Sequence, residues 1–433
     1  MILDRYNQVL QQMPDRIWSG RISRALAGLI ESVGPHCALG DCCTIRDRKG
    51  NEVEGQVVGF HGSTVLSMPL YPATGVRFGD TVSTSGARPC IRVSEAMMGR
   101  VVDAQGYAID GGPPLTGGEL MPVVRPAPDP FEREPIQDAL GTGVRAVDAF
   151  ITCGRGQRLG IFGGSGVGKS TLMGMMARGT SADLTVVALV GERGREVREF
   201  LEDALGEEGR RRSVVVVSTS DQSPLLRLRA AQSAHSIAEY FAARGKNVLL
   251  VLDSITRFAM AQREIGLAAG EPPTAKGYTP SVFTMLAQLV ERVGNFRNGS
   301  ITAFYTVLME GDDQMDPIVD AVRSLLDGHI LLDRRMTSEG HFPPIQMLES
   351  LSRLMPAICA PAHLAKAQRL RRMLADYTRS EDLIRIGAYQ KGADPDLDRA
   401  MSVMPNLRAF TKQGPGETPT LEHTIASLLT MAE

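Results

Sequence analysis

The sequence predicts an α/β protein in which a mostly parallel sheet forms the core, a small β-barrel precedes it and a helical domain follows it. Between residue 136 and about residue 335, apolar runs of strand length alternate with segments of helix length. A strand that is apolar throughout is buried on both faces, as in a parallel sheet covered by helices. Short strand-like runs come before this region, and such runs stop after about residue 345.

The length of the chain also requires more than one domain, because 433 residues exceed what a single ordinary core holds. We expect a short N-terminal segment at residues 1–19, the β-barrel at 20–95, the α/β domain at 96–345 and the helical C-terminal domain at 346–433.

The barrel is predicted from closely spaced strand-like runs at 21–24, 43–46, 54–60 and 64–68, separated by Gly, Asp and Pro. It should end near Val93, and a short helix is expected before it at residues 1–18. The barrel carries no recognisable chemistry, so its expected role is to hold subunits together, since a closed sheet leaves few free edges. Residues 97–135 include a Pro-rich run and should form a rigid, extended connector with little regular structure.

The core strands are expected at 159–162, 185–190, 214–217, 248–252, 301–308 and 329–332. The segments between them have about the right length for right-handed helical crossovers. After the sheet, helices are expected at 364–375, 380–386, 394–404 and 421–431.

The glycine-rich segment that follows the first core strand fits the phosphate-binding pattern G-x-x-x-x-G-K-[ST]. Glycines let backbone N–H groups approach phosphate oxygens, and the helix that begins in the loop points its positive dipole end at the anion. Lys169 can reach the β- and γ-phosphates, and the Ser170 hydroxyl can ligate Mg²⁺. The alternative is a glycine-rich turn with a chance lysine. The expected nucleotide-binding residues are Gly163, Gly164, Ser165, Gly166, Val167, Gly168, Lys169, Ser170 and Thr171.

Two acidic residues end buried strands near this loop. Asp253 follows the apolar run 248–252 and should hold the Mg²⁺ shell, through water; the alternative is that it caps the following helix. Glu192 follows the strand at 185–190 and is the candidate general base that activates the attacking water. Its segment, residues 191–196, also reads as a charged surface turn.

Charge that builds on the γ-phosphate during transfer calls for an additional cation, and an arginine can supply it. The candidates are Arg193, Arg257 and Arg353. Arg353 lies well beyond the nucleotide core in the sequence, so it would reach a phosphate most easily in a neighbouring subunit.

Composition and charge limit the remaining classes. The formal net charge of −2 provides no general electrostatic reason to bind nucleic acid or an acidic membrane surface. No stretch approaches the ~20 apolar residues of a membrane span, and residues 1–15 lack a signal-peptide pattern. The six cysteines are scattered without paired zinc-ligand spacing, so reduced thiols are expected in place of a zinc site.

Taken together, these segments resemble a known family. Residues 155–170 and 191–196 look like the catalytic-subunit superfamily of rotary ATPases, which have a RecA-like P-loop core. The ATPase of flagellar and type III protein export is similar in residues 253–264, 270–273, 276–283 and 326–330. The resemblance covers essentially the whole chain from about Gly20. Residues 223–227, 303–308 and 311–318 resemble the flagellar branch more than the virulence-type branch.

The resemblance implies a cytoplasmic, Mg²⁺-dependent ATPase that forms a homohexamer, docks peripherally beneath a membrane export gate and energises the unfolding and export of flagellar proteins. Its implied partners are a negative regulator, a central-stalk protein, chaperones and export substrates, with no nucleic acid. ATP would bind at subunit interfaces, with Arg353 supplied by the next subunit. Phe342 matches the aromatic residue that packs on adenine, where family members usually carry Tyr; ordinary core packing is the alternative.

Two departures from the family pattern stand out. The region before the barrel is short, which puts regulator binding through it in doubt, and residues 331–335 differ from the usual pattern of Ser before Arg in that strand. Alternative functions are a virulence-type secretion ATPase, the catalytic subunit of an ion-translocating rotary ATPase and a non-enzymatic nucleotide-binding subunit, which typically lacks the catalytic Glu. A ring helicase acting on RNA is a further alternative, although the barrel region shows no stacking aromatics along a basic groove.

Overall fold

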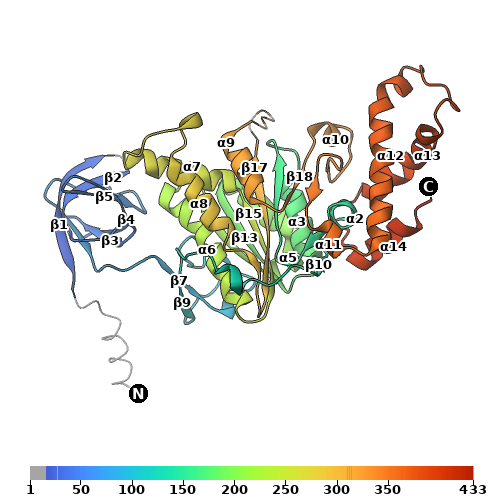
Figure 1. Ribbon diagram of the computed structural model, residues 1–433. Coiled ribbons are helices and arrows are strands. Elements are labelled where there is room, and N and C mark those ends of the chain that lie inside the picture. The colour runs from blue at the N-terminus through green and yellow to red at the C-terminus, as the bar shows by residue number, and fades with distance from the viewer. Residues whose placement is uncertain (1–15, 27, 310, 312, 314, 433) are drawn as a thin grey trace.

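The structure is a computed structural model of the chain and describes residues 16–432 except 27, 310, 312 and 314. It has three parts in a row, the barrel at one end, the α/β core in the middle and helices at the other end (Figure 1). The predicted fold class is therefore confirmed. Most of the helix expected at residues 1–18 falls on residues 1–15, which lie outside the described part of the chain. Residue 18 already begins the first strand.

The N-terminal barrel is a closed, antiparallel sheet in the order β1-β2-β5-β4-β3-β6. Its interior is small and holds Ile22, Ile30, Cys43, Ile45 and Val82. Its strands are β1 (Trp18–Leu26), β2 (Leu29–Val33), β3 (Cys42–Arg46), β4 (Glu52–His61), β5 (Thr64–Pro69) and β6 (Thr81–Thr84).

The segment after the barrel differs from the extended connector that the sequence predicts. β7 (Cys90–Val93) leaves the barrel and pairs with β9 (Glu119–Pro122), while β8 (Val101–Asp103) joins the edge of the core sheet beside β14 (Ser213–Thr219). Val101 and Val102 are buried there, so burial outweighs the loop-like composition. Arg100 donates two hydrogen bonds to Asp110, at 2.8 and 2.7 Å, which closes the turn that follows β8.

The core is one sheet in the order β19-β18-β12-β17-β15-β13-β14-β8, and all neighbours from β18 to β8 are parallel. Every strand expected from the sequence is present. The core strands not yet given are β12 (Arg158–Gly163), β13 (Leu184–Glu192), β15 (Asn247–Asp253), β17 (Ser300–Leu308), β18 (Gly328–Leu331) and β19 (Leu351–Ser352), with β16 (Gly294–Asn295) pairing β17 from outside this order. A separate pair is β10 (Ala139–Leu140) with β11 (Cys153–Gly154).

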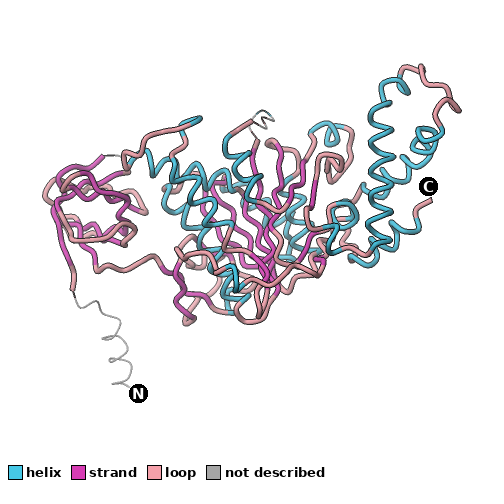
Figure 2. The backbone as a smooth tube through the Cα atoms, viewed as in Figure 1, coloured by secondary structure: helices cyan, strands magenta, loops and turns pink. Residues whose placement is uncertain are grey.

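Helices cover both faces of the core sheet (Figure 2). Alternate residues of β14 show this, because Val214 and Val216 belong to one buried cluster and Val215 and Val217 to the other. The helices of the core are α2 (Arg145–Phe150), α3 (Lys169–Gly179), α4 (Gly194–Glu199), the π-helix η3 (Phe200–Leu205), α5 (Gly206–Arg211), α6 (Pro224–Ala242), α7 (Ile255–Ala268), α8 (Pro280–Val290), α9 (Pro317–Leu325), α10 (Arg334–Ser338) and α11 (Met355–Ile358).

The C-terminal part consists of α12 (Pro361–Arg385), α13 (Pro395–Thr411) and α14 (Leu421–Thr430). The helices expected at 364–375 and 380–386 are a single helix, because no Gly or Pro interrupts the chain between residues 362 and 385. His363 Nε2 lies 2.9 Å from the Ala149 carbonyl oxygen, which ties α12 to the core. None of the described helices is long and apolar enough to span a membrane.

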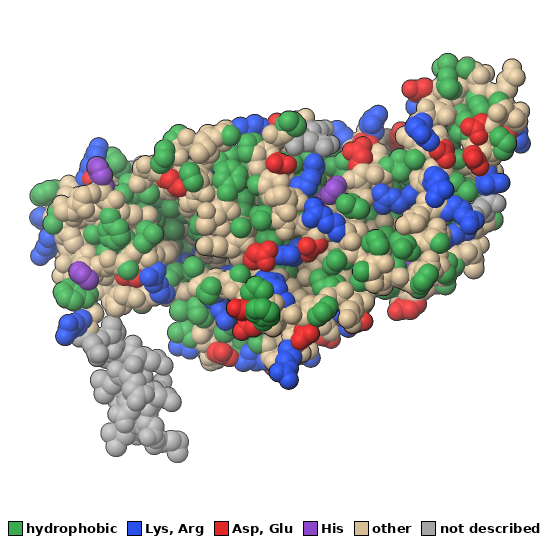
Figure 3. Space-filling view, in the orientation of Figure 1, with side chains coloured by type: hydrophobic (Ala, Val, Ile, Leu, Met, Phe, Trp, Pro, Cys, Tyr) green, Lys and Arg blue, Asp and Glu red, His purple; other side chains and the backbone are tan. Residues whose placement is uncertain are grey.

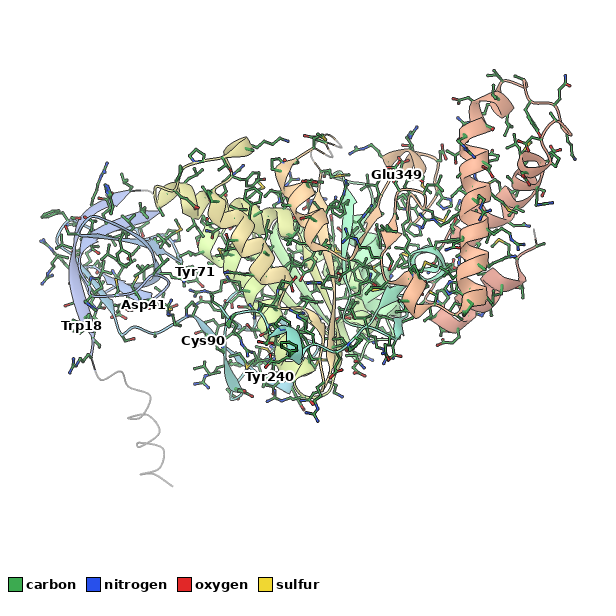
Figure 4. All side chains as sticks on the ribbon, viewed as in Figure 1. Trp18, Asp41, Tyr71, Cys90, Tyr240 and Glu349 are labelled. Carbon is green, nitrogen blue, oxygen red and sulfur yellow. The ribbon has the colours of Figure 1, made fainter. Side chains whose placement is uncertain are left out.

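The barrel meets the core through a polar junction. Ser223 Oγ donates to the Leu70 carbonyl at 2.7 Å, and Tyr71 Oη donates to Gln105 Oε1 at 2.6 Å. Figure 4 labels Tyr71 on the side of the barrel that faces the core. A cavity of about 440 Å³ at this junction is lined by residues such as Cys42, Cys90 and Arg229. The phosphate-loop residues do not line it.

Candidate functional site

The glycine-rich loop connects β12 to α3 at the carboxyl edge of the sheet. Gly166 and Gly168 have φ values of 75° and 98°, a left-handed conformation that favours glycine. Gly163 is also restricted, since a β-carbon there would lie 3.0 Å from Val167 and 3.2 Å from Leu332. Lys169 begins α3, and its Nζ donates to the carbonyl oxygens of Gly163, at 2.9 Å, and Gly164.

The two predicted acidic residues lie together at this edge. Asp253 ends β15 and Glu192 ends β13, and the two strands are adjacent, with Leu189 opposite Asp253. Both carboxylates line a cavity of about 400 Å³ together with Ser170 and Thr171. The strand ends thus bring residues from three separate parts of the sequence to one site.

Burial controls the charge of Glu192. The pKa of Glu192 is raised to about 8, chiefly by removal from water and also by the Asp253 carboxylate and a hydrogen bond to Glu196, while Arg257 opposes these effects. The same hydrogen bond lowers the pKa of Glu196. Burial and the hydrogen bond to Glu196 thus favour the protonated form of Glu192 in the free enzyme.

Asp253 is only 6% exposed, and burial raises its pKa. Three groups favour its charged form: Thr306, whose Oγ1 donates to Asp253 Oδ1 at 2.5 Å, and the cations Lys169 and Arg257. Asp253 does not cap α7, because the side chain of Ser254 does so by accepting from the Arg257 N–H at 3.2 Å. The helix-cap alternative is therefore excluded.

The structure separates the three candidate arginines. Arg257 belongs to the site: its side chain crosses Gly191, where a β-carbon would lie 3.1 Å from Arg257 Cβ. Within the described part of the chain, the buried Nε of Arg257 has no hydrogen-bond partner. Arg193 is 76% exposed, pairs with Glu196 at 3.5 Å and does not line the cavity.

Arg353 lies at a different place, just after β19 at the far edge of the sheet, and is exposed on the surface. Its backbone N–H donates to the Asp327 carbonyl at 2.9 Å. It does not line the cavity of its own subunit. A guanidinium at an exposed sheet edge meets the geometric requirement for contact with a neighbouring subunit.

Helix α10 and the loop after it contact the glycine-rich loop. Arg334 donates to the Ser165 carbonyl at 3.1 Å, and Pro344 approaches Gly168. Phe342 in this loop is 38% exposed, and its carbonyl accepts from the Gln413 N–H at 2.7 Å. Phe342 is thus partly exposed, unlike a core residue, and lies two residues before the Pro344 that approaches Gly168.

The donor set suits Mg²⁺, which keeps several waters and needs few protein ligands besides phosphate oxygens. The Ser170 hydroxyl and the Asp253 carboxylate supply oxygen donors in one cavity. In the residues that the structure describes, no group of three or more His, Cys, Asp or Glu side chains could hold a metal, and the six cysteines are unbridged.

Sequence reasoning overlooked two residues of this site. Glu196 was visible in the charged segment 191–196 but had no assigned role, and its closeness to Glu192 in the sequence was the signal for it. Thr306 lies in an apolar strand 53 residues from Asp253, and nothing in its local pattern reveals the contact.

Comparisons with known proteins agree with this geometry. The family model "ATP synthase alpha/beta family, nucleotide-binding domain" matches residues 143–352, and the model "T3SS EscN ATPase C-terminal domain" matches residues 359–430. The flagellum-specific ATP synthase of Bacillus subtilis is 50% identical, over 95% of this chain and 94% of its own. The flagellum-specific ATP synthase of Salmonella typhimurium is 46% identical, over 98% and 96%.

Secretion proteins are similar as well. The type 3 secretion system ATPase of Sinorhizobium fredii is 44% identical, over 96% of this chain and 92% of its own. The assembled ATPase EscN of the enteropathogenic E. coli type III secretion system superposes with a TM-score of 0.89 at 41% identity, over 95% of this chain and 99% of that one. The chain belongs to the family of flagellum-specific ATP synthases and type 3 secretion system ATPases, within the ATP synthase alpha/beta group.

Proposed function

We propose that this protein hydrolyses ATP with Mg²⁺ at the described cavity and uses the energy to unfold and export flagellar proteins through a type III export apparatus. The observation that carries the catalytic part is the placement of Glu192 and Asp253 at adjacent strand ends, facing one cavity with Ser170. That arrangement supplies a base, a metal-binding acid and a phosphate loop at the same edge.

Each residue has a defined task. The backbone of the loop 163–168 and the Lys169 ammonium bind the phosphates. Ser170 and Asp253 would hold Mg²⁺, which would neutralise charge on the phosphate oxygens when bound. Glu192 accepts the proton of the attacking water, and its raised pKa suits it for that exchange near neutral pH. Arg257 packs against Gly191, next to Glu192, and its positive charge favours the ionised forms of Glu192 and Asp253.

Phe342 would stack on the adenine ring; its partial exposure, two residues before the Pro344 that approaches Gly168, supports this role. Arg193 remains a weaker candidate, since it faces solvent in the single chain. Arg353 would complete the site of the adjacent subunit in a homohexamer and stabilise the charge that develops on the γ-phosphate. EscN, a relative with the same fold, has been solved in assembled form and in complex with its central stalk EscO.

The base assignment is tested with Glu192→Gln. Turnover should fall by about 10²–10⁴-fold, the usual contribution of general acid–base catalysis, while a fluorescent ATP analogue still binds. Glu199→Gln is the matched control, because Glu199 lines the same cavity but pairs with Arg195 at 2.8 Å. Unchanged turnover of Glu192→Gln in assembled rings would refute the assignment.

The shared site is tested by mixing two inactive variants, Lys169→Ala and Arg353→Ala. If Arg353 acts in the neighbouring subunit, random 1:1 rings should recover about a quarter of the wild-type rate, since half of the sites keep Lys169 and half of those face an intact Arg353. No recovery in rings of verified size would show that Arg353 acts within its own subunit or not at all. Wild-type activity should also rise more than linearly with protein concentration.

The flagellar role is favoured because the flagellar relatives from Bacillus and Salmonella are 50% and 46% identical, against 44% for the secretion ATPase of Sinorhizobium. A virulence-type secretion ATPase is the second candidate, supported by the fold shared with EscN. Expression in Salmonella lacking its flagellum-specific ATP synthase should restore flagellin export and motility. Rescue of secretion in E. coli lacking EscN, without rescue of motility, would favour the second candidate.

The proposed setting is the cytoplasm, with a central-stalk protein in the ring, peripheral attachment to the membrane export gate, and a negative regulator, chaperones and export substrates as partners. An ion-translocating rotary subunit would need a non-catalytic partner in its ring. Active rings formed by the purified chain alone would therefore exclude that role.

A further inference from the structure

A buried hydroxyl lies on the strand next to the metal-binding acid. Thr306 is in β17, whose residues are otherwise mostly apolar, and its side chain is 0% exposed. Burying a hydroxyl without a partner costs free energy, so its hydrogen bonds indicate its purpose. The Thr306 Oγ1 lies 2.5 Å from Asp253 Oδ1 and 3.3 Å from the Leu252 carbonyl oxygen.

A hydroxyl has one proton to donate, and the shorter distance directs it to the carboxylate. The distance of 2.5 Å is in the range of O–H···O⁻ bonds to an ionised acceptor. The parallel register fixes the pair, because Leu252 of β15 is opposite Tyr305 of β17. The next residue is Asp253 on β15 and Thr306 on β17. Neither strand can shift by one residue without losing this contact.

A valine at position 306 would pack in β17 as well as threonine does. It has nearly the shape of threonine, favours β-strands and carries no polar atom that needs a partner. In the register of the sheet, the corresponding positions of β13 and β14 carry the apolar residues Leu189 and Val217, both buried. The hydroxyl at position 306 therefore has a role other than filling space.

We propose that Thr306 is a positioning residue for the metal site: its hydroxyl holds Asp253 Oδ1 and fixes the carboxylate in the orientation that Mg²⁺ bound with nucleotide requires. This inference rests on the proposed function. Groups that orient a metal ligand typically change metal affinity by 10–100-fold when they are removed.

The strand itself provides a matched control. Thr302 is four residues earlier in β17, faces the same side of the sheet, is 1% exposed and accepts a hydrogen bond from the Gly156 N–H at 2.8 Å. It lies near the opposite end of the strand, away from the cavity. Thr302→Val removes the same atom from an equally buried position, and Thr306→Ser keeps the hydroxyl at the site.

The experiment measures how strongly a fluorescent ADP analogue binds the assembled full-length protein as MgCl₂ is titrated, with an EDTA arm for binding without metal. Thr306→Val should need about 10–100-fold more Mg²⁺ for half-maximal enhancement of binding, with unchanged affinity in EDTA. Thr306→Ser and Thr302→Val should stay close to wild type. Thermal unfolding and ring size are followed for all variants, because both valine variants lose a buried hydrogen bond.

Equal Mg²⁺ titrations for Thr306→Val and Thr302→Val would overturn the inference, whatever their activities. A weakened affinity of Thr306→Val in EDTA as well would also overturn it, since that marks general damage to the nucleotide site. If the wild-type protein showed no Mg²⁺-dependent binding at all, the proposed function would fail first and the inference with it.

Discussion

The pH dependence of catalysis provides a direct test of the Glu192–Glu196 pair. A base acts only when deprotonated, and the pKa of Glu192 in the free enzyme is raised to about 8. About one-tenth of Glu192 is then ionised at pH 7 and about nine-tenths at pH 9. Because kcat/KM reports the free enzyme, kcat/KM should rise roughly tenfold between these pH values.

The neighbouring carboxylate of Glu196 should set the pH at which kcat/KM rises, the rising limb of the pH profile. Glu196 raises the pKa of Glu192 by accepting its hydrogen bond and by its charge. Glu196→Gln removes the charge and weakens the bond, so the rising limb of kcat/KM should shift to lower pH. The position of the limb is the quantity to compare, since its height also depends on how well the variant binds nucleotide.

The assay is phosphate release at subsaturating Mg·ATP from pH 6 to 9.5, with protein concentration high enough to keep rings assembled. Glu199→Gln is again the control, because Glu199 is exposed and paired with Arg195. A wild-type profile that is flat or falls from pH 7 to 9 would refute the assignment of Glu192 as base with a raised pKa. An unchanged limb in Glu196→Gln would refute the coupling to Glu196.

Three further predictions concern packing, a buried ion pair and base stacking. Gly174→Ala on α3 would place a β-carbon 2.3 Å from the Ala204 carbonyl oxygen of the π-helix, so urea unfolding should show a loss of about 1–3 kcal/mol, whereas Gly416→Ala, with no atom within 4 Å of the new carbon, should be near neutral. Arg292 is 2% exposed, and its guanidinium lies 2.6 Å from Glu239 Oε1. Glu239→Gln would remove this carboxylate and should lower the free energy of unfolding by about 3–5 kcal/mol in the same assay. A loss below about 1 kcal/mol would show that the Val123 carbonyl and Ser236 suffice as partners of Arg292. Phe342→Ala should weaken ATP binding by about 2–12-fold, the value of one aromatic stacking contact, while Phe342→Tyr keeps the ring and should bind as wild type; equal affinities for Ala and Tyr would remove Phe342 from the base-binding site.

Much of the fold and of the site follows from the sequence alone. The apolar runs that became β12, β13, β15 and β17 are buried on both faces, so their local composition determined their structure. In a parallel sheet all carboxyl ends lie at one edge, so a phosphate loop after one strand and acids after two others had to approach each other. That rule places Asp253 and Glu192 near Lys169 without any coordinates.

Surface composition was less informative, because basic and acidic side chains are interspersed over the core on the face shown in Figure 3. The sequence also did not reveal that β8 extends the core sheet or that β7 leaves the barrel, since a strand of three or four residues carries too little pattern to identify its partner.

The side-chain contacts of the site belong to the tertiary structure. Thr306 meets Asp253 because of the register between β15 and β17, and Arg257 covers Gly191 because α7 turns back over the end of β13. The raised pKa of Glu192 depends on burial and on two carboxylates, of which Asp253 comes from another strand. A sequence determines which residues prefer a strand end, whereas register and burial, which depend on the packing of the whole domain, determine what those residues touch and how they ionise.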